Sequence, residues 1–210
     1  ADKLKKKNTI YKKDITSQSG INFVHKENDF IDFKDETLLP WKLSKYGPAL
    51  AVADINKDGL DDFFAGGAIS QASVIYIQNR DGTFRKISQP AIEKDKESED
   101  VNAVFFDANG DGYPDLYVVS GGNEYTDGSP EYQDRLYIND GNGNFSKAAN
   151  ALPPMLSSKL AVAVGDYDGD GDIDIFVGGK TIPGSFPLSS RSYVLRNDSK
   201  NGVAKFTDVT

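Results

Sequence analysis

The sequence predicts an all-β protein built from three related units of four antiparallel strands. Three observations support this: a motif that recurs three times, short runs of β-branched and aromatic residues, and turn residues at fixed places between those runs. The chain has 210 residues, with 20 Gly, 10 Tyr and 12 Phe, and no run of residues that favours a long helix. This composition indicates short strands joined by tight turns.

Each copy of the motif begins with an alternating strand and continues through a nine-residue acidic loop into a second strand that reaches a Gly-Gly pair. The copies are Ala49–Gly67, Asn102–Gly122 and Ala161–Gly179. A third and a fourth strand follow each copy, separated by Asn, Asp and Gly residues typical of hairpins with positive φ. Four short strands in a repeat of about fifty residues are typical of β-propeller blades. A β-sandwich with accidental similarity does not explain four features in the same order.

This repeat divides the chain into five parts. Residues 1–9 are a basic, polar lead-in, and residues 10–46 are expected to form N-terminal strands, either the outer strand of a neighbouring blade or a degenerate fourth repeat. The three blades are residues 47–99, 100–157 and 158–210. Propellers have about four to eight blades, so we expect these three to be part of a larger propeller.

The acidic loops, residues 54–62, 107–115 and 166–174, predict metal binding. Asp or Asn stands at positions one, three, five and nine of each loop, and Gly at position six permits a sharp bend that lets alternate side chains converge. Position seven offers its backbone carbonyl. Oxygen donors in this number favour calcium, and we expect three Ca²⁺ sites. The predicted ligands are Asp54, Asn56, Asp58, Leu60 and Asp62; Asp107, Asn109, Asp111, Tyr113 and Asp115; and Asp166, Asp168, Asp170, Asp172 and Asp174.

Two other interpretations of these loops are weaker. An EF-hand needs a bidentate Glu at position twelve, where this chain has Ala65, Val118 and Val177. A plain polar turn does not explain aligned acidic residues in three copies. Ten of the ligand side chains are carboxylates, which repel one another without a counter-ion. Three calcium ions would carry six positive charges and bring the formal net charge from -8 to -2.

Composition also limits the location and the partners. The net charge of -8 argues against nucleic acid as the main partner. The absence of cysteine excludes disulfides and thiolate zinc sites. No stretch approaches the roughly 18 apolar residues of a transmembrane helix. Calcium loops of extracellular modules bind at roughly 10⁻⁴–10⁻³ M, so we expect a secreted protein that acts outside the cell or at its outer surface.

The loops, their flanking strands and the Gly-Gly pairs resemble FG-GAP/VCBS-type repeats, as in the integrin α-subunit propeller and many bacterial surface proteins. The resemblance covers about residues 47–210. Tyr11–Thr16 and Ser19–His25 are similar to the lead-in of bacterial homologues of cartilage acidic protein, and Phe206–Thr210 repeats the first pattern. The resemblance implies calcium at the twelve Asp and Asn side chains named above. It implies no catalytic activity and does not identify a ligand. Integrin-type propellers have seven blades, whereas this chain has three acidic loops.

A binding face is expected opposite the metal loops, because the second hairpin of each blade points the other way. This face would contain residues 68–73, 123–134 and 180–191 with the inter-blade segment 35–46. It carries the aromatic candidates Trp41, Tyr125, Tyr132 and Phe186, which could stack on sugars or anchor a protein, or could instead pin the loops to the blades. We therefore expect a scaffold or adhesion module whose partners are a protein or glycan ligand and the remaining blades of a longer chain or a partner subunit.

Two other function classes stay open. A glycan hydrolase or lyase would need an acid/base pair, for which Glu124 and Glu131 share a long loop. The single histidine, His25, is expected to be a packing or hydrogen-bonding residue, and no nucleophile elbow or phosphate loop is present. We expect no enzymatic activity. The other class is a purely structural subunit of an outer-surface assembly, marked by a large apolar patch on an exposed blade edge.

Overall fold

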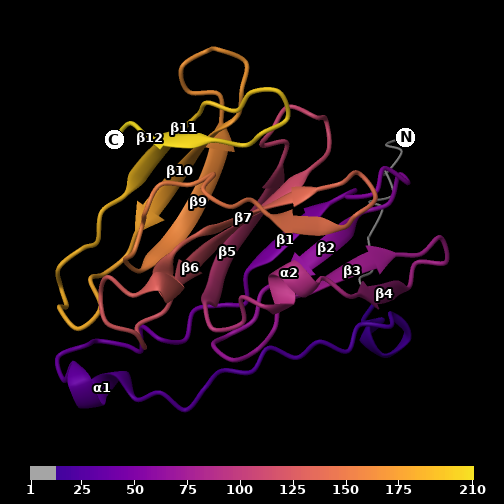
Figure 1. The fold of residues 1–210 in the computed structure, drawn as a ribbon. Helices are drawn as coiled ribbons and strands as arrows, with labels where there is room; N and C mark the ends of the chain where they lie inside the picture. Colours follow the sequence, from indigo (N-terminus) through magenta and orange to yellow (C-terminus); the bar gives the residue numbers. More distant parts are fainter. Residues whose placement is uncertain (1–12) are drawn as a thin grey trace, which may run out of the picture.

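The computed structural model describes residues 13–210, so the lead-in 1–9 and residues 10–12 lie outside the described part. Twelve strands form three four-stranded antiparallel sheets, which confirms the all-β prediction and the four strands per repeat (Figure 1). The strands are β1 (Leu50–Ala53), β2 (Asp62–Ala65), β3 (Val74–Gln78) and β4 (Phe84–Ile87); β5 (Glu99–Phe106), β6 (Asp115–Gly121), β7 (Arg135–Asn139) and β8 (Phe145–Lys147); and β9 (Lys159–Gly165), β10 (Asp174–Gly179), β11 (Tyr193–Asn197) and β12 (Phe206–Asp208).

Helices are short in this part of the chain. They are η1 (Thr16–Gln18), α1 (Asp32–Asp35), α2 (Pro90–Glu93) and η2 (Pro130–Tyr132). Within residues 13–210, none has the length and apolar character needed to cross a membrane.

The three sheets are arranged like successive blades of a propeller (Figure 1). Each sheet is a meander in which neighbouring strands in sequence pair with each other. The first strands of the sheets are neighbours in space: β1 contacts β5, and β5 contacts β9. The blades therefore meet along their inner strands, but three of them do not close a ring.

Alternating side chains hold the blades together. On β6, Leu116 and Val118 pack toward the first blade, against residues such as Phe64. Tyr117 and Val119 pack toward the third blade. Successive side chains of a strand point to opposite faces, so a strand between two blades is apolar on both sides. All seven residues of β6 are accordingly buried.

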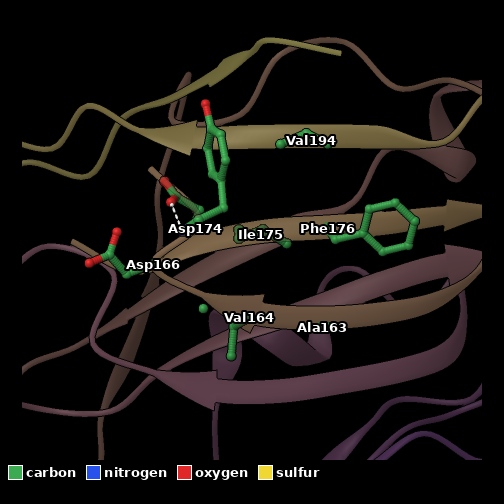
Figure 2. Close-up of a pocket in the computed structure, with 9 residues that line it drawn as sticks. Ala163, Val164, Asp166, Asp174, Ile175, Phe176 and Val194 are labelled. Carbon is green, nitrogen blue, oxygen red and sulfur yellow. Dashed lines mark hydrogen bonds between the residues drawn. The ribbon is translucent and has the colours of Figure 1, made fainter. Parts of the chain in front are cut away.

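The outer faces of the first and third blades lack such a neighbour. Leu50 of β1 is 62% exposed, and Phe176 of β10 is 48% exposed. Phe176 and Val194 line a hollow of about 380 Å³ on the third blade (Figure 2). The second blade buries the equivalent faces on both of its sides, one against the first blade and one against the third.

The structure corrects the prediction of strands in the N-terminal region, because residues 13–46 contain none. From residue 19 to residue 46 the chain forms a strap that runs along one end of all three blades (Figure 1). Side chains make many of its contacts: Gln71 bonds the backbone of Val24 and Lys26, and the Tyr76 hydroxyl accepts from the Asn22 amide. A backbone anchored by side chains at irregular intervals has no ladder partner, so it does not become a strand.

Candidate functional site

The three acidic loops occupy the same place in their blades. Each joins the first strand to the second, and each position-nine Asp pairs with the residue just before position one. The pairs are Ala53 with Asp62, Phe106 with Asp115 and Gly165 with Asp174. The sequence repeat is therefore also a structural repeat at the hairpin tips.

The bend at position six requires glycine. Gly59, Gly112 and Gly171 have φ values of +86°, +84° and +96°, a region that residues with a Cβ rarely adopt. The amide of each glycine donates to the Asp at position one, with distances of 2.8, 2.8 and 3.0 Å. The other oxygen of this Asp accepts a second loop amide in each copy, so both carboxylate oxygens point into the loop and organise it.

The position-nine Asp links three segments of each blade. One oxygen of Asp115 accepts the amide of Ala108 in the loop at 3.0 Å, and the other accepts the amide of Asn139 on β7 at 2.8 Å. Asp62 and Asp174 repeat this arrangement. Each carboxylate oxygen has a second lone pair, so these residues can brace the loop and still coordinate an ion.

The third loop brings its carboxylates closest together. Oxygens of Asp166, Asp168 and Asp174 all lie within 4.8 Å of one another. Figure 2 shows Asp166 and Asp174 at the same end of the strands. Desolvation, followed by repulsion from Asp170 and the other loop carboxylates, raises the pKa of Asp168. A divalent cation relieves this repulsion, so the donors fit a hard ion.

The first two loops carry Asn at position three. The Asn56 and Asn109 amides donate to the position-five carboxylates at 3.1 and 2.9 Å, and their carbonyl oxygens remain inside the loop. Burial, followed by repulsion from Asp111 and Asp107, raises the pKa of Asp115 to about 6. No Lys or Arg among the described residues forms an ion pair with the carboxylates of these two loops, so the loops also present oxygen donors to a cation.

Two asparagines at predicted hairpin turns join one blade to the acidic loop of the preceding blade. The side-chain amide of Asn139 donates to the backbone carbonyl of Ile55, at position two of the first loop, at 2.8 Å. The side-chain amide of Asn197 donates to the backbone carbonyl of Ala108 in the second loop, at 3.2 Å. The sequence shows an Asn at the end of the third strand, or directly after it, in every copy. It does not show which residue of the preceding blade this Asn contacts.

The face opposite the loops assembles from the segments that the sequence indicated. Glu36 of the strap accepts from the Asn123 side chain at 2.8 Å and from the Phe186 amide at 2.8 Å. Lys180 donates to the Leu43 carbonyl at 2.6 Å. The strap thus joins the long loops of the second and third blades.

The four aromatic candidates on this face differ in accessibility. Trp41 is 56% exposed and Phe186 is 36% exposed, whereas Tyr125 is half-buried. The structure corrects the prediction for Tyr132, which is fully buried and donates its hydroxyl to the Tyr125 carbonyl at 2.8 Å. Tyr132 therefore pins its loop to the blade, as the alternative interpretation expected.

The same segments also carry exposed aliphatic residues. Leu38 is 87% exposed, and Leu38 and Phe186 line the same hollow. Leu188 is exposed in the same loop as Phe186, and its carbonyl accepts from the Ile182 amide. We call Leu38, Trp41, Phe186 and Leu188 the strap patch.

The two glutamates proposed as an acid/base pair have separate hydrogen-bond partners. Glu124 accepts from the Asn123 amide at 2.7 Å, and burial raises its pKa. Glu131 accepts from the Ser129 hydroxyl at 2.5 Å. The Asn28 side chain of the strap also donates to Glu124, at 3.5 Å, so the two carboxylates have separate partners.

Comparison with known proteins agrees with the repeat seen in the fold. The model of the FG-GAP-like repeat matches residues 54–118 and 107–177, and the two matches together span more than half of the chain. No curated protein shows a significant match to it. Each matched segment begins at position one of an acidic loop and ends in the second strand of the next blade. The chain belongs to the FG-GAP-like repeat family.

Proposed function

We propose that this protein is a calcium-stabilised, propeller-like binding module that acts outside the cell. The observation that carries the proposal is the threefold repetition of an oxygen-only loop at equivalent hairpin tips, with the carboxylates of Asp166, Asp168 and Asp174 already gathered. Loops of extracellular modules bind calcium weakly, and they fill where calcium is abundant. The calcium sites would stiffen one end of the blades, which leaves the opposite end for a partner.

The strap patch is the proposed binding surface. It combines exposed apolar side chains with the acidic Glu36 and Asp35, which line the neighbouring hollows. Aromatic and aliphatic anchors surrounded by polar groups are typical of protein interfaces. A protein ligand is therefore the first choice, and a glycan stacked on Trp41 is the alternative outcome.

Substitution of the strap patch tests this surface. The variant Trp41→Ala/Phe186→Ala should lose roughly tenfold or more in affinity for any ligand found in a screen of surface proteins and glycans, because anchor residues dominate binding energy. Surface plasmon resonance in calcium measures the loss. Tyr167→Ala is the matched control, since Tyr167 is an equally exposed aromatic at the opposite end of the third blade. Equal affinity of the double variant and the wild type would place the binding site elsewhere.

We also propose that further blades of this family cover the two open faces. The faces of Leu50 and Phe176 correspond to the faces that the second blade buries on both sides. The first two loops receive an Asn from the next blade, whereas Tyr167 at position two of the third loop is exposed. A fourth blade would bring an equivalent Asn to this position.

Left alone, the open faces should make the 210-residue chain self-associate, because contiguous exposed apolar surface and unprotected sheet faces favour association. Sedimentation velocity over a range of concentrations should show this. Val52→Glu with Phe176→Glu should reduce association. Val203→Glu makes the same type of change in an exposed turn and should leave it unaltered. A concentration-independent monomer in the wild type would contradict the proposal.

A glycan-active enzyme is the second candidate function. A panel of glycans incubated with the wild type, Glu124→Gln and Glu131→Gln distinguishes the two classes. Turnover that both substitutions abolish would support the enzyme. Binding without turnover would support the module.

A further inference from the structure

A buried polar cluster lies at the blade end opposite the acidic loops. It joins His25 and Glu27 of the strap to Glu99, the first residue of β5. A nitrogen of His25 and carboxylate oxygens of the two glutamates all lie within 4.8 Å of one another. The second acidic loop follows Phe106 at the other end of β5, so this cluster is separate from the proposed calcium sites.

Two carboxylate oxygens of the cluster have no hydrogen-bond partner among the described residues. Glu99 is only 1% exposed; its Oε2 accepts from the Ile69 amide at 3.1 Å, while its Oε1 is unpartnered. Oε2 of Glu27 is also buried and unpartnered. Buried polar atoms in native proteins nearly always have a partner. These two oxygens therefore point to a group that binds between them.

The surroundings of His25 lead to the same conclusion. Its Nδ1 lies 3.3 Å from the Gly66 carbonyl oxygen, and its Nε2 lies 2.8 Å from Oε1 of Glu27. Both neighbours are acceptors, but a neutral imidazole has a single N–H. With that proton on Nδ1, the Nε2 lone pair faces the carboxylates. A backbone carbonyl on one ring nitrogen and carboxylates around the other is the usual setting of a metal-bound histidine.

Acidic side chains predominate around the cluster, because Glu124 lies close to both Glu27 and Glu99. Lys180 attracts Glu99 and Glu124 electrostatically. Its ammonium, however, lies 3.7 Å from the centre of the Tyr46 ring and donates to the Leu43 carbonyl. No Lys or Arg among the described residues forms an ion pair with Glu27, Glu99 or Glu124.

We propose that His25, Glu27 and Glu99 bind a first-row divalent metal ion of the Zn²⁺ type, with the fourth coordination position left to water. The imidazole nitrogen favours such an ion over calcium, which selects oxygen donors. Ligand atoms of a tetrahedral zinc site lie about 3.3 Å apart, so the distances among the His25, Glu27 and Glu99 ligand atoms need to shorten by at most about 1.5 Å. A Cβ at Gly122 would lie 2.6 Å from Oε2 of Glu124 and 3.3 Å from Cβ of Glu99, so glycine permits their close approach.

Such an ion would fasten the strap to the second blade. Two ligands come from the strap and one from β5. The same strap continues to Leu38 and Trp41 of the strap patch. The metal would therefore hold the segment that carries the proposed binding surface, without being part of that surface.

Zinc uptake by the full chain in excess calcium tests the site. Equilibrium dialysis followed by metal analysis should find one Zn²⁺ per chain, and zinc should raise the melting temperature. His25→Gln and Glu99→Gln should each weaken binding by roughly 100-fold or more, because each removes a direct ligand. Glu97→Gln is the matched control: Glu97 lies two residues before Glu99 but is exposed. This variant should bind like the wild type.

Glu99→Gln also separates lost binding from lost folding. It keeps the shape of the side chain and replaces an acidic group buried beside other carboxyl groups with a neutral amide, so the metal-free variant should melt no lower than the metal-free wild type. The proposal is overturned if the wild type takes up no zinc. It is equally overturned if zinc binds the His25 and Glu99 variants as tightly as the wild type.

Discussion

Chelation of calcium is expected to lower the melting temperature of this protein by about 2–16 °C. Ligands that bind only the folded state stabilise it by RT ln(1 + [L]/Kd). With Kd values of roughly 10⁻⁴–10⁻³ M and calcium near 1 mM, three sites contribute about 1–4 kcal/mol in total. A domain of this size shifts by about 2–4 °C per kcal/mol. Calorimetry in calcium and in excess chelator measures the difference.

Variants of the first loop show whether the ligand positions produce this effect. Asp58→Asn replaces a position-five carboxylate, whereas Asp61→Asn makes the same change at position eight, which is not a predicted ligand. Asp58→Asn should lose about a third of the calcium-dependent shift, and Asp61→Asn should keep all of it. A melting temperature that chelator does not change, or equal losses in the two variants, would refute calcium binding by these loops.

The variant Lys159→Met should lose about 3–5 kcal/mol of stability, the cost of leaving a buried charge unpaired. Lys159 is fully buried at the start of β9, and its ammonium lies 3.3 Å from Oδ1 of Asp134. It also donates to the carbonyls of Tyr132, Met155 and Ser157 at 2.5, 2.8 and 2.7 Å. This cation therefore joins the second blade to the third.

Removal of the cation leaves Asp134 buried with the Tyr117 hydroxyl and the Ser120 amide as partners. Burial is the largest influence on both groups; it raises the pKa of Asp134 and lowers that of Lys159 against their mutual attraction. The pair thus depends on its close contacts. Thermal melting should show a decrease of about 6–20 °C for Lys159→Met.

Two further variants test whether the unpaired buried charge causes this decrease in melting temperature. Arg191→Met breaks the exposed pair with Asp208 and should cost about 1 kcal/mol or less. Lys159→Met/Asp134→Asn removes both buried charges and should be more stable than Lys159→Met alone, because no unpaired charge remains. If Lys159→Met melts no lower than Arg191→Met, the buried ion pair does not hold the blades together.

The strands and the loop geometry could be predicted because they depend on local patterns. Alternating apolar residues specify a strand such as β9, and the glycine at position six specifies the bend, since only glycine adopts that φ at little cost. The strap could not be predicted in this way. Its apolar residues, such as Ile21 and Phe23, resemble those of a strand but pack with their side chains on the first blade. Whether another strand lies in position to pair with this segment does not depend on the sequence of the segment itself.

The sequence by itself determined the repeat, the number of strands and the positions of the acidic loops, because residues a few places apart specify each of them. Only the tertiary structure decided which groups from distant segments meet. It buried Tyr132, joined Asn139 to Ile55 of the preceding blade and placed His25 beside Glu99. These contacts depend on how whole blades and the strap pack, and the packing buries each group among residues from several parts of the chain.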